Sequence, residues 1–161
     1  MAVNLDDVDW AIINQLQQEA RISLSELGRR VNLSSSATTE RVRQLESQGI
    51  ITGYRAVVDL GKAGYPVLAV VRLKYPGNRH EPLRQLLAER REILECVRTT
   101  GEDCYTLKMA ATSMEHLEKL VDELAGFGST TTSVVYSQTL PYRGPDRPTG
   151  AHQAATVADA E

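Results

Sequence analysis

The stretch that decides the fold is residues 23–49, SLSELGRRVNLSSSATTERVRQLESQG. It holds two runs with inward-facing residues at helical spacing, separated by Asn32, which breaks the pattern. The first run opens at Ser23, and Glu26 three residues later has the spacing of a capping box. The second run opens near Ser34 and ends at Gly49, a common residue for a left-handed helix terminus. The stretch therefore predicts two helices joined by a tight turn.

A further helix is expected upstream of this pair. Its apolar residues fall close to a 3.6-residue period: Leu5, Val8, Ile12, Ile13 and Leu16. Aspartates crowd its first turn, where the helix dipole favours negative charge. Three short helices would then share one small core over residues 1–52. Because the last helix opens with hydroxyl side chains and carries arginines, its N-terminal end suits entry into a DNA groove.

The spacing of apolar residues changes after Gly49, and the segments that follow are rich in β-branched residues. We expect strands over residues 50–60, 65–75, 93–100, 104–112 and 130–140. Helices are expected around Leu83, Leu86 and Leu87, with Ile93 as a possible extension, and after a capping box formed by Thr112 and Glu115. Without the strand at 50–60, the order is β-α-β-β-α-β, as in ferredoxin-like folds.

The expected fold class is therefore α+β, with an N-terminal winged helix-turn-helix domain joined to a C-terminal ferredoxin-like βαββαβ domain. The boundaries we expect are 1–52 for the first domain, 53–64 for a linking strand or hinge, 65–143 for the second domain, and 144–161 for a flexible tail without apolar periodicity. An open four-stranded sheet cannot leave both faces to solvent, so we expect a second copy to cover it.

Charge is distributed unevenly along the 161-residue chain, whose formal net charge is −3. Residues 21–55 hold six arginines against three glutamates, so a basic head is attached to an acidic body. Two cysteines and three scattered histidines make no metal-ligand set, and we expect no cofactor. The acidic N-terminus is not a signal peptide and no apolar run could span a bilayer, so the cytoplasm is the expected compartment.

The run LDDVDWAIINQLQQEARISLSELGRRVNLSSSATTERVRQLESQGIITGY, with the βαββαβ half after it, resembles the Lrp/AsnC (feast/famine) family of transcription regulators. The resemblance covers roughly residues 4–142. It implies an N-terminal helix-turn-helix, a linking strand and a C-terminal domain for dimerisation and effector binding. It also implies dimers that associate further, commonly into octamers, on the DNA of the nucleoid. The effectors of the family are small molecules, usually amino acids, that bind where dimers meet.

The candidate DNA-binding residues lie on the third helix: Ser34, Ser35, Ser36, Thr39, Arg41 and Arg43. Hydroxyls bond bases and phosphates with little selectivity, whereas an arginine on guanine contributes about 1–3 kcal/mol of discrimination. Two alternatives stay open. Ser34 can simply cap the helix, and the arginines can pair with glutamates instead. Arg41 sits nearer the buried side and suits an internal ion pair equally well.

The candidate effector-binding residues are those that the resemblance implies: Thr100, Gly101, Glu102, Asp103, Cys104, Thr131, Thr132 and Ser133. The family's turn carries an aspartate where this chain has Cys104, and Asp103 stands one residue early. One step along a strand points a side chain to the other face. The hydroxyls near Thr132 can also reflect strand propensity alone, and Cys104 can be a small, partly buried thiol.

Two functions remain open from the sequence. The first is a sequence-specific regulator of transcription whose DNA binding or oligomeric state responds to a small effector, such as an amino acid or related metabolite. The second is an architectural protein that wraps or bridges DNA without an effector, which the substitution at Cys104 would favour. An enzyme is not expected, because no metal cluster, phosphate loop or nucleophile-and-base motif is present.

Overall fold

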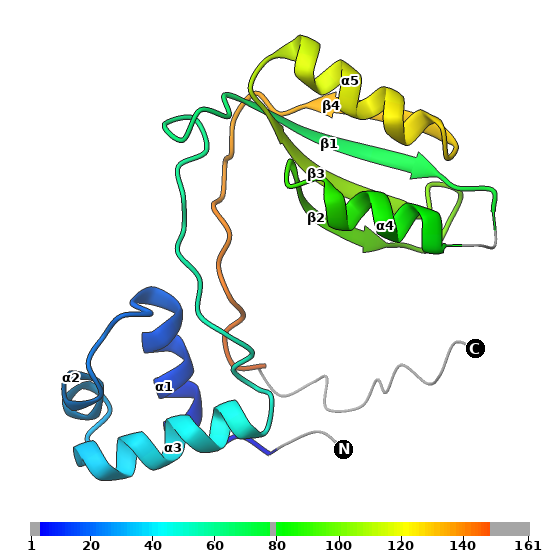
Figure 1. The fold of residues 1–161 in the computed structure, drawn as a ribbon. Helices are drawn as coiled ribbons and strands as arrows, with labels where there is room; N and C mark the ends of the chain where they lie inside the picture. The colour runs from blue at the N-terminus through cyan, green and yellow to red at the C-terminus, as the bar shows by residue number, and fades with distance from the viewer. Residues whose placement is uncertain (1–3, 78–79, 149–161) are drawn as a thin grey trace. The chain divides into compact units, whose positions relative to one another are not determined.

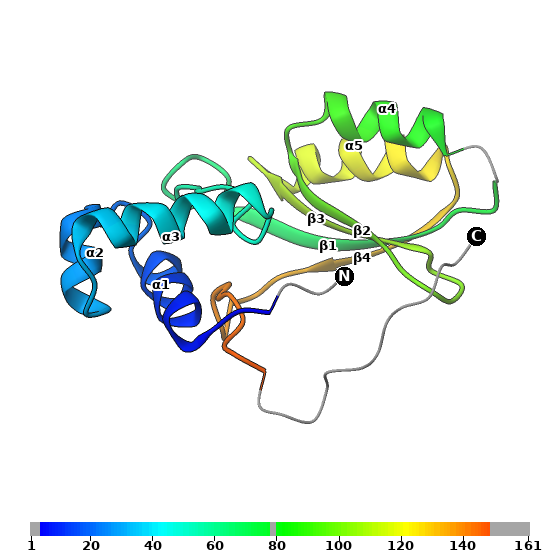
Figure 2. The ribbon, with the colours of Figure 1, turned by 90° about the horizontal axis from the view of Figure 1, so that it is seen from below.

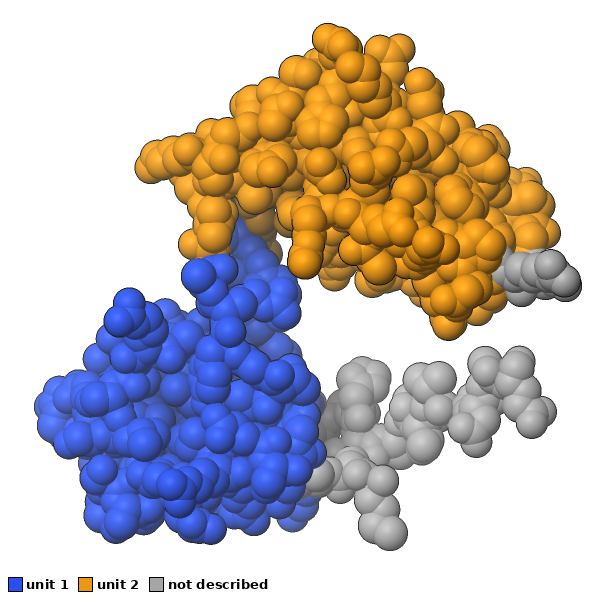
Figure 3. All heavy atoms as spheres, in the orientation of Figure 1, with its two compact units in different colours: residues 1–56, 141–161 blue, residues 57–140 orange. Residues whose placement is uncertain are grey.

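The chain forms two compact units in the computed structural model, which describes residues 4–77 and 80–148 (Figures 1 and 3). Unit 1 comprises the chain up to residue 56 together with the part after residue 140, and unit 2 comprises residues 57–140.

Unit 1 contains three helices, as the sequence predicts: α1 (Asp7–Gln18), α2 (Leu24–Arg30) and α3 (Ser35–Ser47) (Figure 1). Each helix contributes fully buried side chains to one core, which is built on Ile12, Leu27, Val42 and Leu45. Burial of these side chains is what positions the short helices, because helices of 7 to 13 residues are marginal by themselves.

The ends of the helices agree with the residues that predicted them. The hydroxyl of Ser23 accepts a hydrogen bond from the Glu26 N–H, and that of Ser34 accepts one from the Ala37 N–H, both at 3.2 Å. Asn32 adopts a left-handed backbone with φ of 57° between α2 and α3. Gly49 has φ of 70° just after α3, where a residue with a Cβ atom would be strained.

The turn between α2 and α3 depends on a close approach at Gly28. A Cβ atom there would lie 2.7 Å from the Thr38 hydroxyl oxygen and 2.8 Å from the Leu33 carbonyl oxygen. Thr38 is fully buried, and its hydroxyl donates to the Ser34 carbonyl oxygen at 2.9 Å. Gly28 therefore allows α3 to cross α2 at short range.

Unit 2 has the expected βαββαβ order: β1 (Val67–Lys74), α4 (Glu81–Glu89), β2 (Ile93–Arg98), β3 (Tyr105–Ala111), α5 (Met114–Ala125) and β4 (Ser129–Val134). The strands form one antiparallel sheet in the order β2-β3-β1-β4. This arrangement confirms the ferredoxin-like prediction.

Both helices of unit 2 cover the same face of the sheet (Figure 2). Alternate residues of β1, including Val71 and Leu73, are fully buried on that face with Leu107 and Met109 of β3. The intervening residues, such as Arg72, belong to the face without helices. That face is the one that a second copy would have to cover.

Some expected boundaries differ from the structure. No strand forms over residues 50–60, all of which are described, because nothing pairs with this exposed segment; Val57 is 96% exposed. The last strand ends at Val134 instead of residue 140, since its final partner on β1 is Ala69. Ile93 begins β2 and does not extend α4.

One expected helix cap also needs correction. The cap of α5 is Ser113, whose hydroxyl accepts from the His116 N–H at 3.1 Å, so the capping box expected at Thr112 and Glu115 does not form. The start of the expected tail lies within the described residues, and it contacts α1. The Pro145 carbonyl oxygen accepts from the Gln17 side chain at 3.2 Å, and Arg147 pairs with Asp7. The remainder of the tail, 149–161, lies outside the described residues.

None of the helices within residues 4–77 and 80–148 has the length and apolar character needed to cross a membrane.

Candidate DNA-binding helix and effector turn

The exposed face of α3 carries most of the candidate DNA-binding residues. Thr38, Val42 and Leu45 bury the other face, so Ser35, Ser36 and Arg43 are exposed. Thr39 lies on the same side but is half-buried, and its hydroxyl donates to the Ser35 carbonyl oxygen at 2.7 Å. The helix therefore exposes the hydroxyls of Ser35 and Ser36 near its N-terminus and the Arg43 guanidinium two turns later.

Ser34 caps α3, as the simpler of its two readings proposed. Its hydroxyl accepts from the Ala37 N–H and lies 3.1 Å from the Ser36 hydroxyl. A cap at a helix N-terminus remains compatible with a phosphate contact, because N–H groups and the helix dipole favour anions there.

Arg41 forms an internal ion pair. Its Nη1 donates to Asp6 Oδ2 at 2.7 Å and to Asp9 Oδ1 at 2.9 Å, which joins α3 to the start of α1. The Asp9 side chain is only 13% exposed. The pKa of Asp6 is lowered by the hydrogen bond from the Asp9 N–H and then by Arg41. The guanidinium of Arg41 is therefore already bound, unlike that of Arg43.

Two more arginines of the basic head are bound to glutamate. Glu26 accepts from both Arg29 and Arg30, at 2.7 and 3.0 Å, and these hydrogen bonds lower its pKa from 4.5 to about 2. Arg30 also reaches Glu19 and Gln15, at 3.1 Å in each case, so it joins α2 to α1. Among the described residues, Arg43 has no hydrogen-bond or ion-pair partner.

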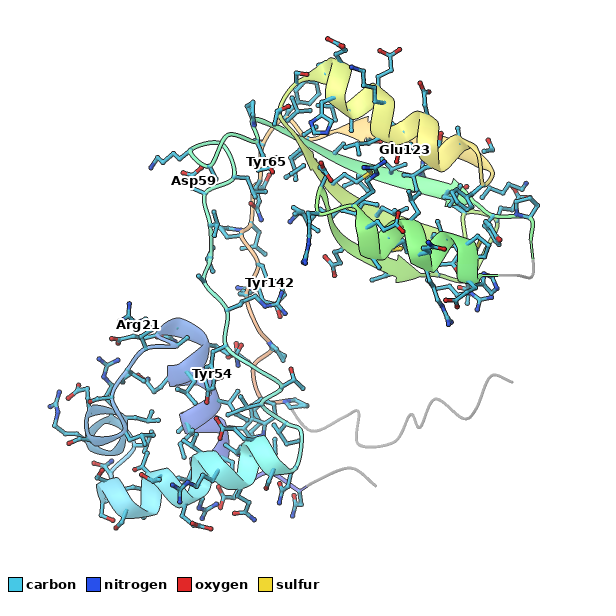
Figure 4. All side chains as sticks on the ribbon, viewed as in Figure 1. Arg21, Tyr54, Asp59, Tyr65, Glu123 and Tyr142 are labelled. Atoms are coloured by element: carbon cyan, nitrogen blue, oxygen red, sulfur yellow. The ribbon has the colours of Figure 1, made fainter. Side chains whose placement is uncertain are left out.

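A shallow hollow of about 310 Å³ lies beside Arg43. Its lining combines aliphatic side chains of α1, α2 and the segment between them with residues of α3 and the segment after it: Leu16, Ala20, Ile22, Leu24, Thr39, Val42, Arg43, Glu46 and Tyr54. Tyr54, which is labelled in Figure 4, donates its hydroxyl to Glu46 Oε1 at 3.0 Å. This contact was not predicted from the sequence, although the motif ITGY shows a tyrosine soon after the end of the helix.

The candidate effector turn joins β2 to β3. The Thr99 N–H donates to the Cys104 carbonyl oxygen at 2.9 Å, and the Thr99 hydroxyl donates to the Asp103 carbonyl oxygen at 2.7 Å. Gly101 has φ of 103°, a conformation that favours glycine, and Thr100 and Glu102 are exposed beside it. These two bonds close the turn without using any candidate carboxylate.

Both carboxylates of the turn face basic residues of β1. Glu102 lies 3.0 Å from the Lys74 ammonium, and Asp103 lies 3.7 Å from Arg72 Nε. Arg72 and Lys74 were not predicted as site residues, although the alternation in VLAVVRLK was a signal that could have placed them on one face.

Strand β4 divides its hydroxyls between the two faces of the sheet. Thr131 pairs with Arg72 and Ser133 pairs with Val70, so both belong to the face without helices. Thr132 pairs with Val71 and lines a hollow of about 200 Å³ between α5 and β4. The structure therefore brings Asp103, Arg72 and Thr131 to one face and places Thr132 on the other.

Cys104 lies at the margin of the core. Its Sγ is 3.6 Å from the Tyr75 carbonyl oxygen and 3.9 Å from that of Leu73. Its environment is that of a small, half-buried thiol. No group of three or more histidine, cysteine or acidic side chains that could hold a metal ion occurs in the described part of the chain.

Comparison with known proteins finds a match for each of the two parts of the chain that carry these sites. Residues 5–52 match the model of a winged helix-turn-helix DNA-binding domain, and residues 68–145 match that of the Lrp/AsnC ligand binding domain. The chain is 38% identical to the transcriptional regulator LrpC of Bacillus subtilis over 84% of this chain and 94% of that protein. The structure of LrpC superposes with a TM-score of 0.81 over 84% of this chain and 97% of that one.

Two other relatives are informative. The leucine-responsive regulatory protein of Salmonella typhimurium is 35% identical over 84% of this chain and 87% of its own length. A feast or famine regulatory protein from M. tuberculosis, whose structure is complexed with L-methionine, is 28% identical. It has a TM-score of 0.82 over 88% of this chain and 99% of that one.

Proposed function

The chain belongs to the Lrp/AsnC family of transcription regulators, and we propose that α3 reads specific DNA sites while an amino acid bound to unit 2 controls that binding or the assembly of the protein. The family membership makes the chain a DNA-binding regulator. The residues that read DNA, the effector and the oligomeric state are the parts that we propose.

The observation that carries the DNA-binding proposal is the free guanidinium of Arg43. The neighbouring arginines of α2 and α3 are bound to carboxylates, whereas Arg43 points from the exposed face of α3 without a partner among the described residues. An unpaired arginine on a recognition helix can bind guanine O6 and N7 without first breaking an ion pair. Ser35, Ser36 and Thr39 would contact bases or phosphates beside it.

The effector proposal rests on the charges at the turn. Asp103, Arg72 and Thr131 share one face, so an anion, a cation and a hydroxyl converge there. An α-amino acid carries both an ammonium and a carboxylate, and this set offers a partner for each. The relatives support the same class of ligand, since one is named as leucine-responsive and another is complexed with L-methionine.

The uncovered face of the sheet supports the assembly proposal. We expect homodimers to form there and to associate further into octamers, with dimers presenting two copies of α3 about one helical turn of DNA apart (~34 Å). We also expect the protein to act on nucleoid DNA in the cytoplasm.

A binding screen tests the effector proposal. The full chain is titrated with each of the twenty amino acids while its thermal unfolding and its affinity for a DNA duplex selected in vitro are measured. At least one amino acid should shift both, and Asp103→Asn should weaken its binding more than Glu102→Gln does. If no amino acid shifts either quantity, the architectural function replaces the ligand-responsive one.

A further inference from the structure

Tyr54 lies in the segment that follows α3, and its hydroxyl reaches back to that helix. The 3.0 Å hydrogen bond to Glu46 spans eight residues and joins the segment after Gly53 to the last turn of α3. The Tyr54 side chain also lines the hollow that contains Arg43. Because 48% of the surface of Tyr54 is exposed, core packing does not explain why a tyrosine with this hydroxyl contact stands here.

Glu46 carries a carboxylate that would compete with DNA for the guanidinium of Arg43. The two residues are three positions apart on α3, a spacing at which an arginine and a glutamate pair on a helix surface. They also line the same hollow. Yet Arg43 is unpaired among the described residues, and the carboxylate of Glu46 accepts from Tyr54 instead.

We propose that Tyr54 is a positioning residue for DNA recognition: by holding the carboxylate of Glu46, it keeps the guanidinium of Arg43 free to reach a base. This inference rests on the proposed role of Arg43 and extends it to Tyr54 and Glu46, which are not among the candidate DNA-binding residues. Loss of the Tyr54 hydroxyl would release the carboxylate of Glu46 beside the exposed face of α3. There the carboxylate can pair with Arg43 and repel phosphate.

The chemistry of the contact suits a permanent hold. Burial, followed by the hydrogen bond to Glu46, raises the pKa of Tyr54 to about 12. The phenol therefore stays protonated and remains a hydrogen-bond donor throughout the neutral range.

The test measures the affinity of the full chain for a duplex selected in vitro against the wild type, with a shuffled duplex as the reference. Tyr54→Phe keeps the ring and removes only the hydroxyl. It should weaken binding to the selected duplex on the order of two- to fivefold, the scale of one surface ion pair formed in competition. Its thermal unfolding should match that of the wild type to within a few degrees.

A double-mutant cycle separates positioning from a general structural effect. In a Glu46→Gln background, Tyr54→Phe should cause no further loss, because no carboxylate is left to release. Glu40→Gln is the matched control, since Glu40 lies three residues on the other side of Arg43 and is exposed. In that background the loss caused by Tyr54→Phe should persist.

The outcomes distinguish this inference from the function on which it rests. If Arg43→Ala weakens specific binding but Tyr54→Phe does not, or if Tyr54→Phe acts equally with Glu46→Gln, the positioning role is wrong and the reading role of Arg43 stands. If Arg43→Ala leaves specific binding intact, the assignment of Arg43 itself fails.

Discussion

Two arginines on α3 illustrate how neighbouring residues of one type acquire different tasks. Arg41 and Arg43 are two positions apart, so the helix directs them to different sides. Arg41 meets Asp6 and Asp9 of the first helix, whereas Arg43 meets no partner among the described residues. The first arginine therefore stabilises unit 1, and the second is available for DNA.

Replacing Arg41 with alanine should destabilise unit 1 by about 1–2 kcal/mol, because Asp9 would keep a poorly exposed carboxylate without its charged partner. Chemical denaturation followed by circular dichroism measures this loss. Arg43→Ala is the control and should change the unfolding free energy by less than about 0.5 kcal/mol. Equal stability of the two variants would contradict the division of tasks.

The sequence predicted part of this arrangement. The cap at Ser34 followed from local spacing, because the groups that it bonds are three residues away. The partner of Arg41 could not be chosen from spacing, since Asp6 lies 35 residues earlier in the chain. Local contacts are thus readable from the sequence, while contacts between elements need the packing.

Among the helices, α1 and α2 are joined by the charges around Glu26, and this junction should depend on pH. The pKa of Glu26 in the folded chain, about 2, lies below its ordinary value of 4.5. A lowered carboxyl pKa stabilises the fold above the ordinary value, and that contribution is lost as the pH falls from 4.5 towards 2.

Thermal unfolding of wild type and Glu26→Gln across this pH range checks the expectation. The wild type should be the more stable protein at pH 6, and the difference should vanish near pH 2. A difference that stays constant down to pH 2 would show that Glu26 acts through packing instead of charge.

The crossing of α2 and α3 makes a separate prediction. Gly28→Ala would place a methyl group within 3 Å of the Leu33 carbonyl oxygen and the Thr38 hydroxyl, so it should destabilise unit 1 by about 1–3 kcal/mol. Denaturant unfolding measures the loss, and Ser25→Ala on the exposed side of α2 serves as the control. Unchanged stability of Gly28→Ala would mean that the helices can separate without cost.

For the helices and strands, the sequence predicted the order along the chain but not every boundary. Strand β1 was readable because its buried residues alternate, whereas the strand expected at 50–60 has suitable residues and no partner. Strand formation depends on pairing, which composition cannot specify. The same limit explains why β4 stops at Val134, where its pairing with β1 ends.

For the whole molecule, the sheet face without helices is the proposed dimer surface. Val70 belongs to this face, half-buried between Lys108 of β3 and Ser133 of β4. Val70→Glu should shift the protein from dimers or larger assemblies to monomers in light scattering after gel filtration, because a buried unpaired carboxylate is costly. Val57→Glu, at a residue that is 96% exposed, should leave the assembly unchanged.

Only part of the candidate effector site could be predicted from the sequence. The resemblance supplied Asp103 and Thr131, but Arg72, which lies between them on the sheet, comes from a strand that is not adjacent in sequence to either. Thr132, chosen by the same resemblance, faces the helices instead. Strand order and register decide which candidates meet.

The most direct test of the account is a footprint of the full chain carrying Arg43→Ala and Ser36→Ala on a DNA fragment that contains the selected site. The specific footprint should be lost, while unfolding and the oligomeric state should stay as in the wild type, since both side chains are exposed on α3. A footprint retained at wild-type concentration, or its loss together with the assembly, would contradict the role of α3 as the helix that reads DNA.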